Sequence, residues 1–147
     1  MMTPEHILSL IPHREPFRFI DHLEHADREG AQGHYTFRED EYFFKGHFPD
    51  KPIVPGVILV EVMAQIGVLP CALVHINPAP DSRMEMAFTH CHVDFLHPVY
   101  PGDTLQVSSS VTRFRLGKIY CEAEARNQHG TLCCKGSLQG ISKSTPA

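Results

Sequence analysis

One stretch of the chain consists almost entirely of apolar residues, whereas much of the remainder alternates between apolar and polar positions. The apolar stretch runs from Ile53 to Ile76 and has the length of a helix rather than of a strand. We therefore predict a buried helix from about Gly56 to Val74, which Pro70 is expected to kink or shorten. The stretch is interrupted by Pro55, Glu61, Gln65 and Pro70. These interruptions favour a core helix over a membrane span, so we expect no membrane partner.

Shorter periodic segments flank the apolar stretch. Before it, the pattern predicts a short helix over residues 4–10 with Thr3 as its cap, and strands over 17–26 and 31–39. After it come strand-like runs over 84–95, 103–116, 118–127 and 130–141, with Gly117 and Gly130 at tight turns. One long helix with a meander of strands predicts an α+β fold. Because the chain has no repeat or linker, we expect a single domain spanning 1–147.

Composition and charge exclude several classes of partner. The chain has 147 residues, 42% of them hydrophobic, which suits one compact domain. Its net charge is -4 and it has no long Lys/Arg block, so we expect no nucleic-acid partner. The five cysteines form no C-x-x-C pair, and their odd number argues against a disulfide framework. The N-terminus does not have the pattern of a secretory signal, and we expect a cytoplasmic protein.

Glu61 and His47 are the strongest candidates for chemistry. An apolar helix gains nothing from Glu61, and burying an unpaired carboxylate costs several kcal/mol, so function is the better explanation for this residue. His47 lies fourteen positions earlier, in a loop that prolines make stiff. The prolines of this loop are Pro49, Pro52 and Pro55. The loop is therefore expected to hold the imidazole in one place against the start of the helix.

Three groups of motifs carry a resemblance to a known family. The first group is Gly46-His47-Phe48-Pro49, Pro55-Gly56, Glu61 and Met63-Ala64-Gln65, and the others are the run Ile11 to Phe17 and the turn Pro98 to Asp103. In order and spacing they resemble the hot-dog-fold 3-hydroxyacyl-[acyl-carrier-protein] dehydratases of fatty-acid synthesis. The resemblance implies a curved antiparallel sheet wrapped around one long helix. It also implies dehydration of a 3-hydroxyacyl thioester to a trans-2-enoyl thioester, without a cofactor.

The residue types suit this reaction, because an elimination of water needs a base at C2 and an acid at C3. The resemblance implies that His47 is the base and Glu61 the acid, whose apolar surroundings favour the neutral form. It also implies that the backbone N–H of Gly56 stabilises the thioester oxygen and that Gln65 orients the Glu61 carboxyl. Relatives that also isomerise the double bond carry aspartate at this position, so Glu61 favours dehydration alone.

Other interpretations of individual residues remain open at this point. Glu61 is also consistent with an interface residue paired with an arginine, and Gln65 with a buried amide satisfied by the backbone. His13 belongs to an N-terminal motif and is expected to have a structural role. His90, His92 and Asp94 share one face of a strand at spacings that could bind a metal, but the opposite face has the pattern of an inward-facing one. That opposite face carries Thr89, Cys91, Val93 and Phe95. We assign no metal.

The expected partner is an acyl carrier protein, which is acidic. Relatives place several lysines or arginines on the strand where this chain has His92, Asp94, Leu96 and His97. Docking is therefore assigned instead to Arg113, Arg115 and Lys118 around the turn at Gly117. The absence of the usual basic residues from this strand is consistent with a dedicated polyene, polyketide or lipid pathway as an alternative to housekeeping fatty-acid synthesis.

One sheet covers only part of an apolar helix, so we expect the central helix to pack against its copy in a two-fold homodimer. The resemblance adds that His47 of one subunit faces Glu61 of the other, and that dimers group into hexamers as a trimer of dimers. Two alternative functions are an acyl thioesterase of the same fold and a non-catalytic acyl-binding or scaffolding subunit. The pairing of His47 with Glu61 argues against both.

Overall fold

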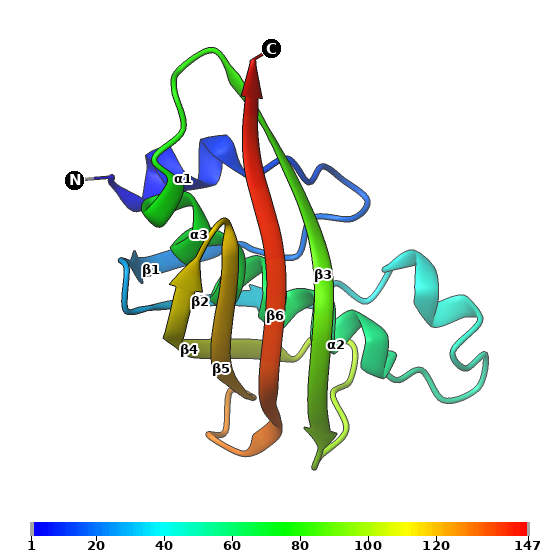
Figure 1. The fold of residues 1–147 in the computed structure, drawn as a ribbon. Helices are drawn as coiled ribbons and strands as arrows, with labels where there is room; N and C mark the ends of the chain where they lie inside the picture. Colours follow the sequence, from blue (N-terminus) through cyan, green and yellow to red (C-terminus); the bar gives the residue numbers. More distant parts are fainter. Residues whose placement is uncertain (1, 147) are drawn as a thin grey trace.

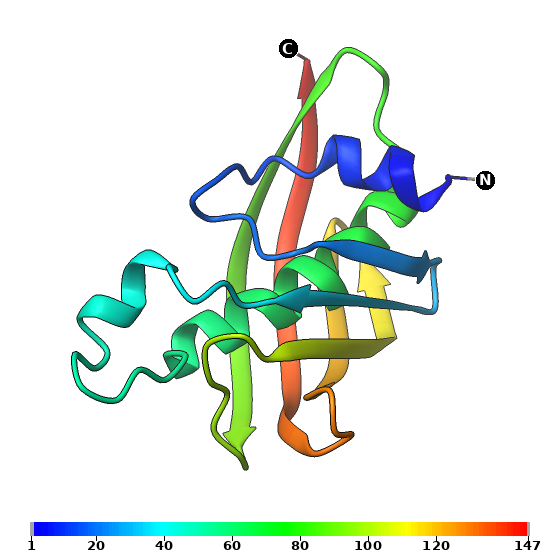
Figure 2. The ribbon, with the colours of Figure 1, turned by 180° about the vertical axis from the view of Figure 1, so that it is seen from behind.

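A six-stranded antiparallel sheet wraps around a central helix in the computed structural model, which describes residues 2–146. The strands are β1 (His22–Ala26), β2 (Gly30–Thr36), β3 (Ser82–Phe95), β4 (Thr104–Arg115), β5 (Lys118–Arg126) and β6 (Leu132–Pro146), in the spatial order β1-β2-β4-β5-β6-β3. Strands β5, β6 and β3 lie in front of the helix in Figure 1, and β1, β2 and β4 lie in front of it in the reverse view of Figure 2. The twisted sheet thus covers two sides of the helix, and the hot-dog fold is confirmed.

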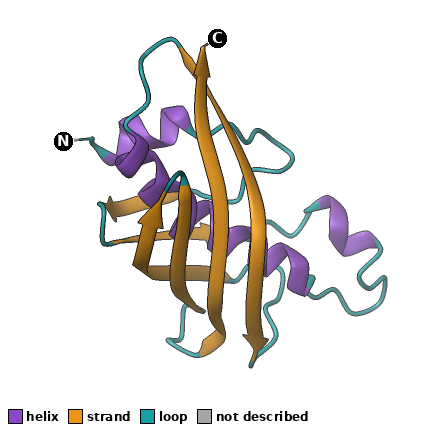
Figure 3. Ribbon diagram, in the orientation of Figure 1, coloured by secondary structure: helices purple, strands orange, loops and turns teal. Residues whose placement is uncertain are grey.

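The central helix runs without a break from Gly56 to Ile76 (Figure 3), and its winding changes in the middle. It consists of α2 (Gly56–Met63), a π-helical turn η2 (Ala64–Val68) and α3 (Leu69–Ile76). Pro70 has no N–H to donate, and the wider turn directly before it absorbs the discontinuity, with the N–H of Leu69 bonding to the carbonyl of Ala64. Of the predicted kink or shortening of the helix at Pro70, the shortening is wrong, because the π turn lets the helix continue to Ile76.

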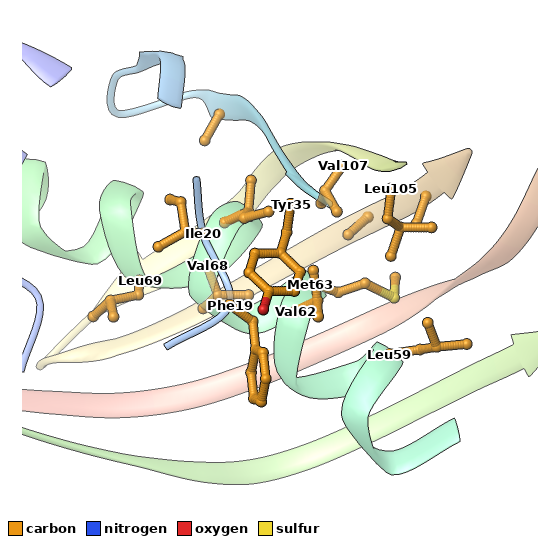
Figure 4. Close-up of a cluster of buried hydrophobic side chains, with 14 of the residues drawn as sticks. Phe19, Ile20, Tyr35, Leu59, Val62, Met63, Val68, Leu69, Leu105 and Val107 are labelled. Carbon is orange, nitrogen blue, oxygen red and sulfur yellow. The ribbon is translucent and has the colours of Figure 1, made fainter. Parts of the chain in front are cut away.

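The central helix forms the core of the protein. Its 18-residue window of highest hydropathy has a mean hydropathy of 2.2, which is apolar enough to cross a membrane, but 72% of that window is buried inside the fold. Figure 4 shows Leu59, Val62 and Met63 of this helix packed with aromatic and aliphatic side chains from the sheet and the N-terminal segment. The prediction of a buried core helix is confirmed.

The sequence pattern located most elements but misplaced several of their ends. Helix α1 (Pro4–Leu10) begins as predicted, and the Thr3 hydroxyl accepts a hydrogen bond from the N–H of His6. Strand β1 begins at His22 rather than at residue 17. The intervening segment is irregular because its polar backbone bonds to a side chain of the central helix, as described below. Strand β6 extends to Pro146 rather than to 141, because its pairing with β3 continues from Cys134 to Pro146.

Strand β3 forms one edge of the sheet, and much of it is exposed on both faces. Thr89, Cys91 and Phe95 are exposed and Val93 is only half-buried, so the prediction that this face points inward is wrong for the single chain. The physical reason is that β3 is an edge strand which the central helix approaches closely at Phe95, beside Gly56, so that the side chains before Phe95 are left largely uncovered. Among residues 2–146, no group of three or more His, Cys, Asp and Glu side chains is placed to hold a metal ion.

Candidate active site

Glu61 lies on α2 with its carboxyl group held by Gln65, one helical turn further on. The Gln65 amide donates to Glu61 Oε2 at 2.8 Å and to the Phe17 carbonyl at 3.1 Å, and its oxygen accepts from the N–H of Phe19 at 2.7 Å. Gln65 is only 1% exposed, so these bonds satisfy an amide that would otherwise be costly to bury. Gln65 therefore bonds both to the backbone and to the Glu61 carboxyl group, as the two interpretations of this residue require.

His13 is a third polar side chain beside the carboxylate, with His13 Nε2 at 3.5 Å from Glu61 Oε2. The guanidinium groups of Arg14 and Arg18 donate to the His13 carbonyl at 2.8 and 3.3 Å, which holds the loop in place. Burial lowers the pKa of His13 below 6.5, with Arg18 acting in the same direction and Glu61 opposing it. Sequence reasoning gave His13 a structural role only. Its contact with Glu61 joins residues 48 positions apart, which no local pattern reveals.

Glu61, Gln65 and His13 lie on the wall of a cavity of about 170 Å³ between the central helix and the sheet. Most of the remaining wall is apolar. Its apolar side chains are Ala64, Val68, Leu69, Ala72, Met86, Ala87, Phe88, Ile119 and Ile141. A cavity of this kind, apolar with a few polar groups at defined points, suits a small organic chain with one reactive end.

His47 lies outside that cavity, in the loop that follows the short helix η1 (Tyr42–Lys45). Its Nδ1 is 2.9 Å from the Ile53 carbonyl oxygen. A carbonyl oxygen only accepts, so Nδ1 carries the proton and Nε2 of the neutral ring carries the free lone pair. The ring also stacks on Phe48, with centroids 4.2 Å apart. The loop therefore holds the imidazole by Nδ1 and leaves Nε2 able to accept a proton.

The loop that carries His47 projects beyond the sheet in Figures 1 and 2. Its start is held to the body because the Glu41 carboxylate accepts from the Tyr35 hydroxyl and from the Arg38 N–H, the latter at 3.1 Å. The single chain thus brings Gln65 and His13 to Glu61 but does not bring His47 into the same cavity.

Gly56 is the first residue of α2, and Pro55 before it provides no side-chain cap. Within the described part of the chain, the Gly56 N–H has no hydrogen-bond acceptor, as is usual for the first N–H groups of a helix. A Cβ on Gly56 would lie 3.2 Å from the ring of Phe95, so a side chain here would crowd the end of β3. The position combines a free donor with a close approach to the edge strand.

The candidate docking residues gather at the turn between β4 and β5. Arg113 and Lys118 lie over the ring of Tyr120, with 5.6 and 5.2 Å to the centroid. Arg115 flanks the same turn, where Leu116 is 88% exposed. This basic hairpin tip also contacts β6, because the Ser142 N–H donates to the Gly117 carbonyl at 2.9 Å. The tip is therefore adjacent to the cavity at Ser142.

The FabA-like domain family matches residues 11–133. The chain belongs to this family. Two relatives named 3-hydroxyacyl-[acyl-carrier-protein] dehydratase FabZ, from Roseiflexus sp. and Herpetosiphon aurantiacus, are each 38% identical to it. The alignments cover 94% of this chain in both cases, and 94% and 96% of the two relatives. The predicted family is thus confirmed over nearly the whole sequence.

Solved structures confirm the fold. A chain of the dehydratase heterocomplex ApeI:P from Xenorhabdus doucetiae superposes with a TM-score of 0.78 at 15% identity, covering 97% of this chain and 93% of that one. A hypothetical thioesterase with coenzyme A from Streptococcus pneumoniae gives a TM-score of 0.62 at 12% identity, covering 85% and 87%. At these identities the likeness concerns architecture alone, which both enzyme classes share.

Proposed function

We propose that this protein is a 3-hydroxyacyl-[acyl-carrier-protein] dehydratase that eliminates water to give a trans-2-enoyl thioester. The observation that carries the proposal is the Glu61 carboxyl, held by Gln65 at 2.8 Å on the wall of an apolar cavity. Membership of the FabA-like family and 38% identity to two FabZ dehydratases support the same reaction. The pathway is fatty-acid synthesis or a related polyene or polyketide route.

In the proposed mechanism, His47 Nε2 takes the proton from C2 of the substrate. This role suits the imidazole because Nδ1 is already engaged with the Ile53 carbonyl. Glu61 donates its proton to the C3 hydroxyl, which leaves as water while the C2–C3 double bond forms. The Gly56 N–H, at the positive end of the helix dipole, donates to the thioester oxygen as negative charge develops there.

We further propose that the catalytic pair is completed across a homodimer. His47 does not line the Glu61 cavity of its own chain, so a second subunit must supply the base if both residues act on one substrate. Large apolar side chains are exposed in the same region, including Val57 at 77%, Phe48 at 53% and Phe95 at 53%. Two such chains would each gain a His47 from the other, and dimers grouped in threes would form a hexamer.

For the carrier protein we propose docking at Arg113, Arg115 and Lys118. These cations flank an exposed leucine and form a compact basic patch at the hairpin tip. A basic rim attracts an acidic partner and speeds its encounter with the site.

We also propose a cytoplasmic location, which is supported by five cysteines that are all unpaired in the fold.

The proposal is tested by supplying 3-hydroxyacyl thioesters of several chain lengths, on acyl carrier protein and on coenzyme A, and identifying the products by mass. The expected product is lighter than the substrate by one water and retains the thioester. Release of free 3-hydroxy acid would instead identify a thioesterase, and an unchanged substrate that binds tightly would identify a non-catalytic acyl-binding subunit.

A further inference from the structure

Two buried polar atoms on the cavity wall have no hydrogen-bond partner. Across the described residues, they are the only buried side-chain nitrogen or oxygen atoms in this condition: His13 Nδ1 and Ser142 Oγ. Both residues line the cavity that contains Glu61. Buried polar groups are almost always paired, so a buried hydroxyl without a partner, on a residue that lines a cavity, points to a ligand atom that supplies the missing hydrogen bond.

The backbone of Ser142 is held in place by its neighbours. Ser142 is 5% exposed and pairs with Met86 in the β3–β6 ladder. Its N–H donates to the Gly117 carbonyl, and its own carbonyl oxygen lies only 2.7 Å from where a Cβ on Gly117 would stand. Strand and turn together fix the backbone of Ser142, while the side chains of Met86 and Ile119, which line the same cavity, are apolar.

Ser142 lies at the end of the cavity away from Glu61. Near its start, strand β6 contacts the central helix close to Glu61. There Cys134 Sγ is 3.4 Å from Sδ of Met63, a residue two positions after Glu61. Ser142 follows Cys134 by eight residues, or roughly 26 Å of strand at about 3.3 Å per residue. The turn that Ser142 contacts is also close to the end of α3, because Phe114 stacks on His75 with centroids 4.3 Å apart.

The proposed function fixes the direction of the substrate, and this inference rests on it. The thioester lies at the Gly56 N–H and C3 at Glu61, so the rest of the acyl chain continues along the helix toward Val68 and Ala72. Those residues line the cavity. The far part of the acyl chain, and not the carrier arm, therefore reaches Ser142.

We propose that Ser142 is a polar subsite that selects acyl chains bearing a keto or hydroxyl oxygen beyond C3. A serine hydroxyl donates to a keto oxygen and equally accepts from a hydroxyl group, so either substituent gives the Ser142 hydroxyl a hydrogen-bond partner. A site built to bond an oxygen disfavours the analogue that lacks one, because the buried hydroxyl is then left unpaired. Such a chain comes from an extension reaction that leaves an earlier carbonyl or hydroxyl group unreduced or uneliminated.

The test uses pairs of 3-hydroxyacyl-pantetheine thioesters of equal length, one saturated and one with a keto group at a single position beyond C3. For one position we expect kcat/KM to exceed that of the saturated partner by about tenfold. Ser142→Ala should lower kcat/KM for the preferred keto chain to that of the saturated chain and so abolish the preference. Ser144→Ala, the same change at an exposed serine on the same strand, should retain it.

Two results would overturn the proposal: no keto position preferred by the unaltered protein, or a preference that survives Ser142→Ala. Equal slowing of the keto and saturated substrates by Ser142→Ala is a case of the second result, since the ratio of their kcat/KM values is then unchanged. Calorimetric binding of the same chains without the 3-hydroxyl group measures the preference independently of turnover. If no 3-hydroxyacyl thioester is dehydrated, the proposed function fails, while the binding preference still decides the subsite.

Discussion

Glu61 can be recognised as an unusual residue from its position in the sequence alone. A carboxylate in an apolar helix is conspicuous, and Gln65 one turn later predicts the hydrogen bond that the structure contains at 2.8 Å. His13 and Ser142 give no such signal. Their relation to Glu61 depends on chain segments that meet only in the folded protein, and an ordinary histidine and serine carry no pattern of their own.

The roles proposed for His47 and Glu61 predict the effect of substituting each residue. His47→Ala and Glu61→Gln should each lower kcat by about a thousandfold or more while leaving the fold intact, because a base and an acid act on the same elimination. The double variant should be little slower than either single one, as measured by initial rates of enoyl product formation. Rates near that of the unaltered protein in either single variant would exclude that residue.

His13 predicts a pH dependence of stability. Burial lowers its pKa in the folded state below the ordinary 6.5, so the unfolded chain binds the proton first as the pH falls. The free energy of unfolding should therefore decrease from just above pH 6.5 downward until His13 is also protonated in the folded state. His13→Gln should remove this part of the decrease, measured as urea midpoints at about pH 7.5 and about pH 5, whereas His6→Gln at an exposed position should not. An unchanged slope in His13→Gln would contradict the assignment.

At the scale of elements, hydrophobic periodicity located the helices and strands, but backbone details depended on tertiary contacts. Nothing in the sequence distinguishes a π turn from a kink at Pro70. The turn is stabilised from outside the helix, because the Ser109 hydroxyl on β4 donates to the Gly67 carbonyl at 2.6 Å and accepts from the Ala31 N–H at 3.2 Å. Similarly, the pattern of β3 predicted an inward face, and only the sheet order shows that β3 is an edge.

Ser109→Ala should therefore destabilise the protein by about 1–3 kcal/mol, because it leaves the Gly67 carbonyl and the Ala31 N–H without that partner. The measurement is the free energy of unfolding in urea, with Ser110→Ala, an exposed neighbour on the same strand, as the matched control. If both variants lose the same small amount, the hydroxyl does not support the turn.

At the scale of the whole molecule, one chain does not bring the two proposed catalytic residues together, because His47 does not line the cavity that contains Glu61. In the proposed binding mode the carrier arm approaches Glu61 from Gly56, whereas the basic hairpin tip lies beside Ser142 at the other end of its own cavity. Docking at this tip therefore requires the hairpin of one subunit to lie near the Gly56 end of another. The residues of the hairpin tip and of the Gly56 end of the cavity could be predicted from the sequence. The sequence contains no information on whether the two surfaces that act together belong to the same subunit.

The docking proposal predicts that reversing Arg113 and Arg115 to Glu raises the KM for a carrier-bound substrate by about tenfold and has little effect on the KM for a coenzyme A analogue. The difference should shrink as salt is added, because added ions screen the attraction. Unchanged carrier kinetics in the double reversal would show that the carrier docks elsewhere.

The most direct test of the account mixes two inactive proteins. Subunits carrying His47→Ala are exchanged with subunits carrying Glu61→Gln, and dehydration of a 3-hydroxyacyl thioester is followed. Every mixed dimer with shared sites has one site that retains both His47 and Glu61, so an equal mixture should recover about one quarter of the activity of the unaltered protein. Absence of recovery, with mixed dimers demonstrated by mass spectrometry, would contradict the pairing of His47 with Glu61 across subunits.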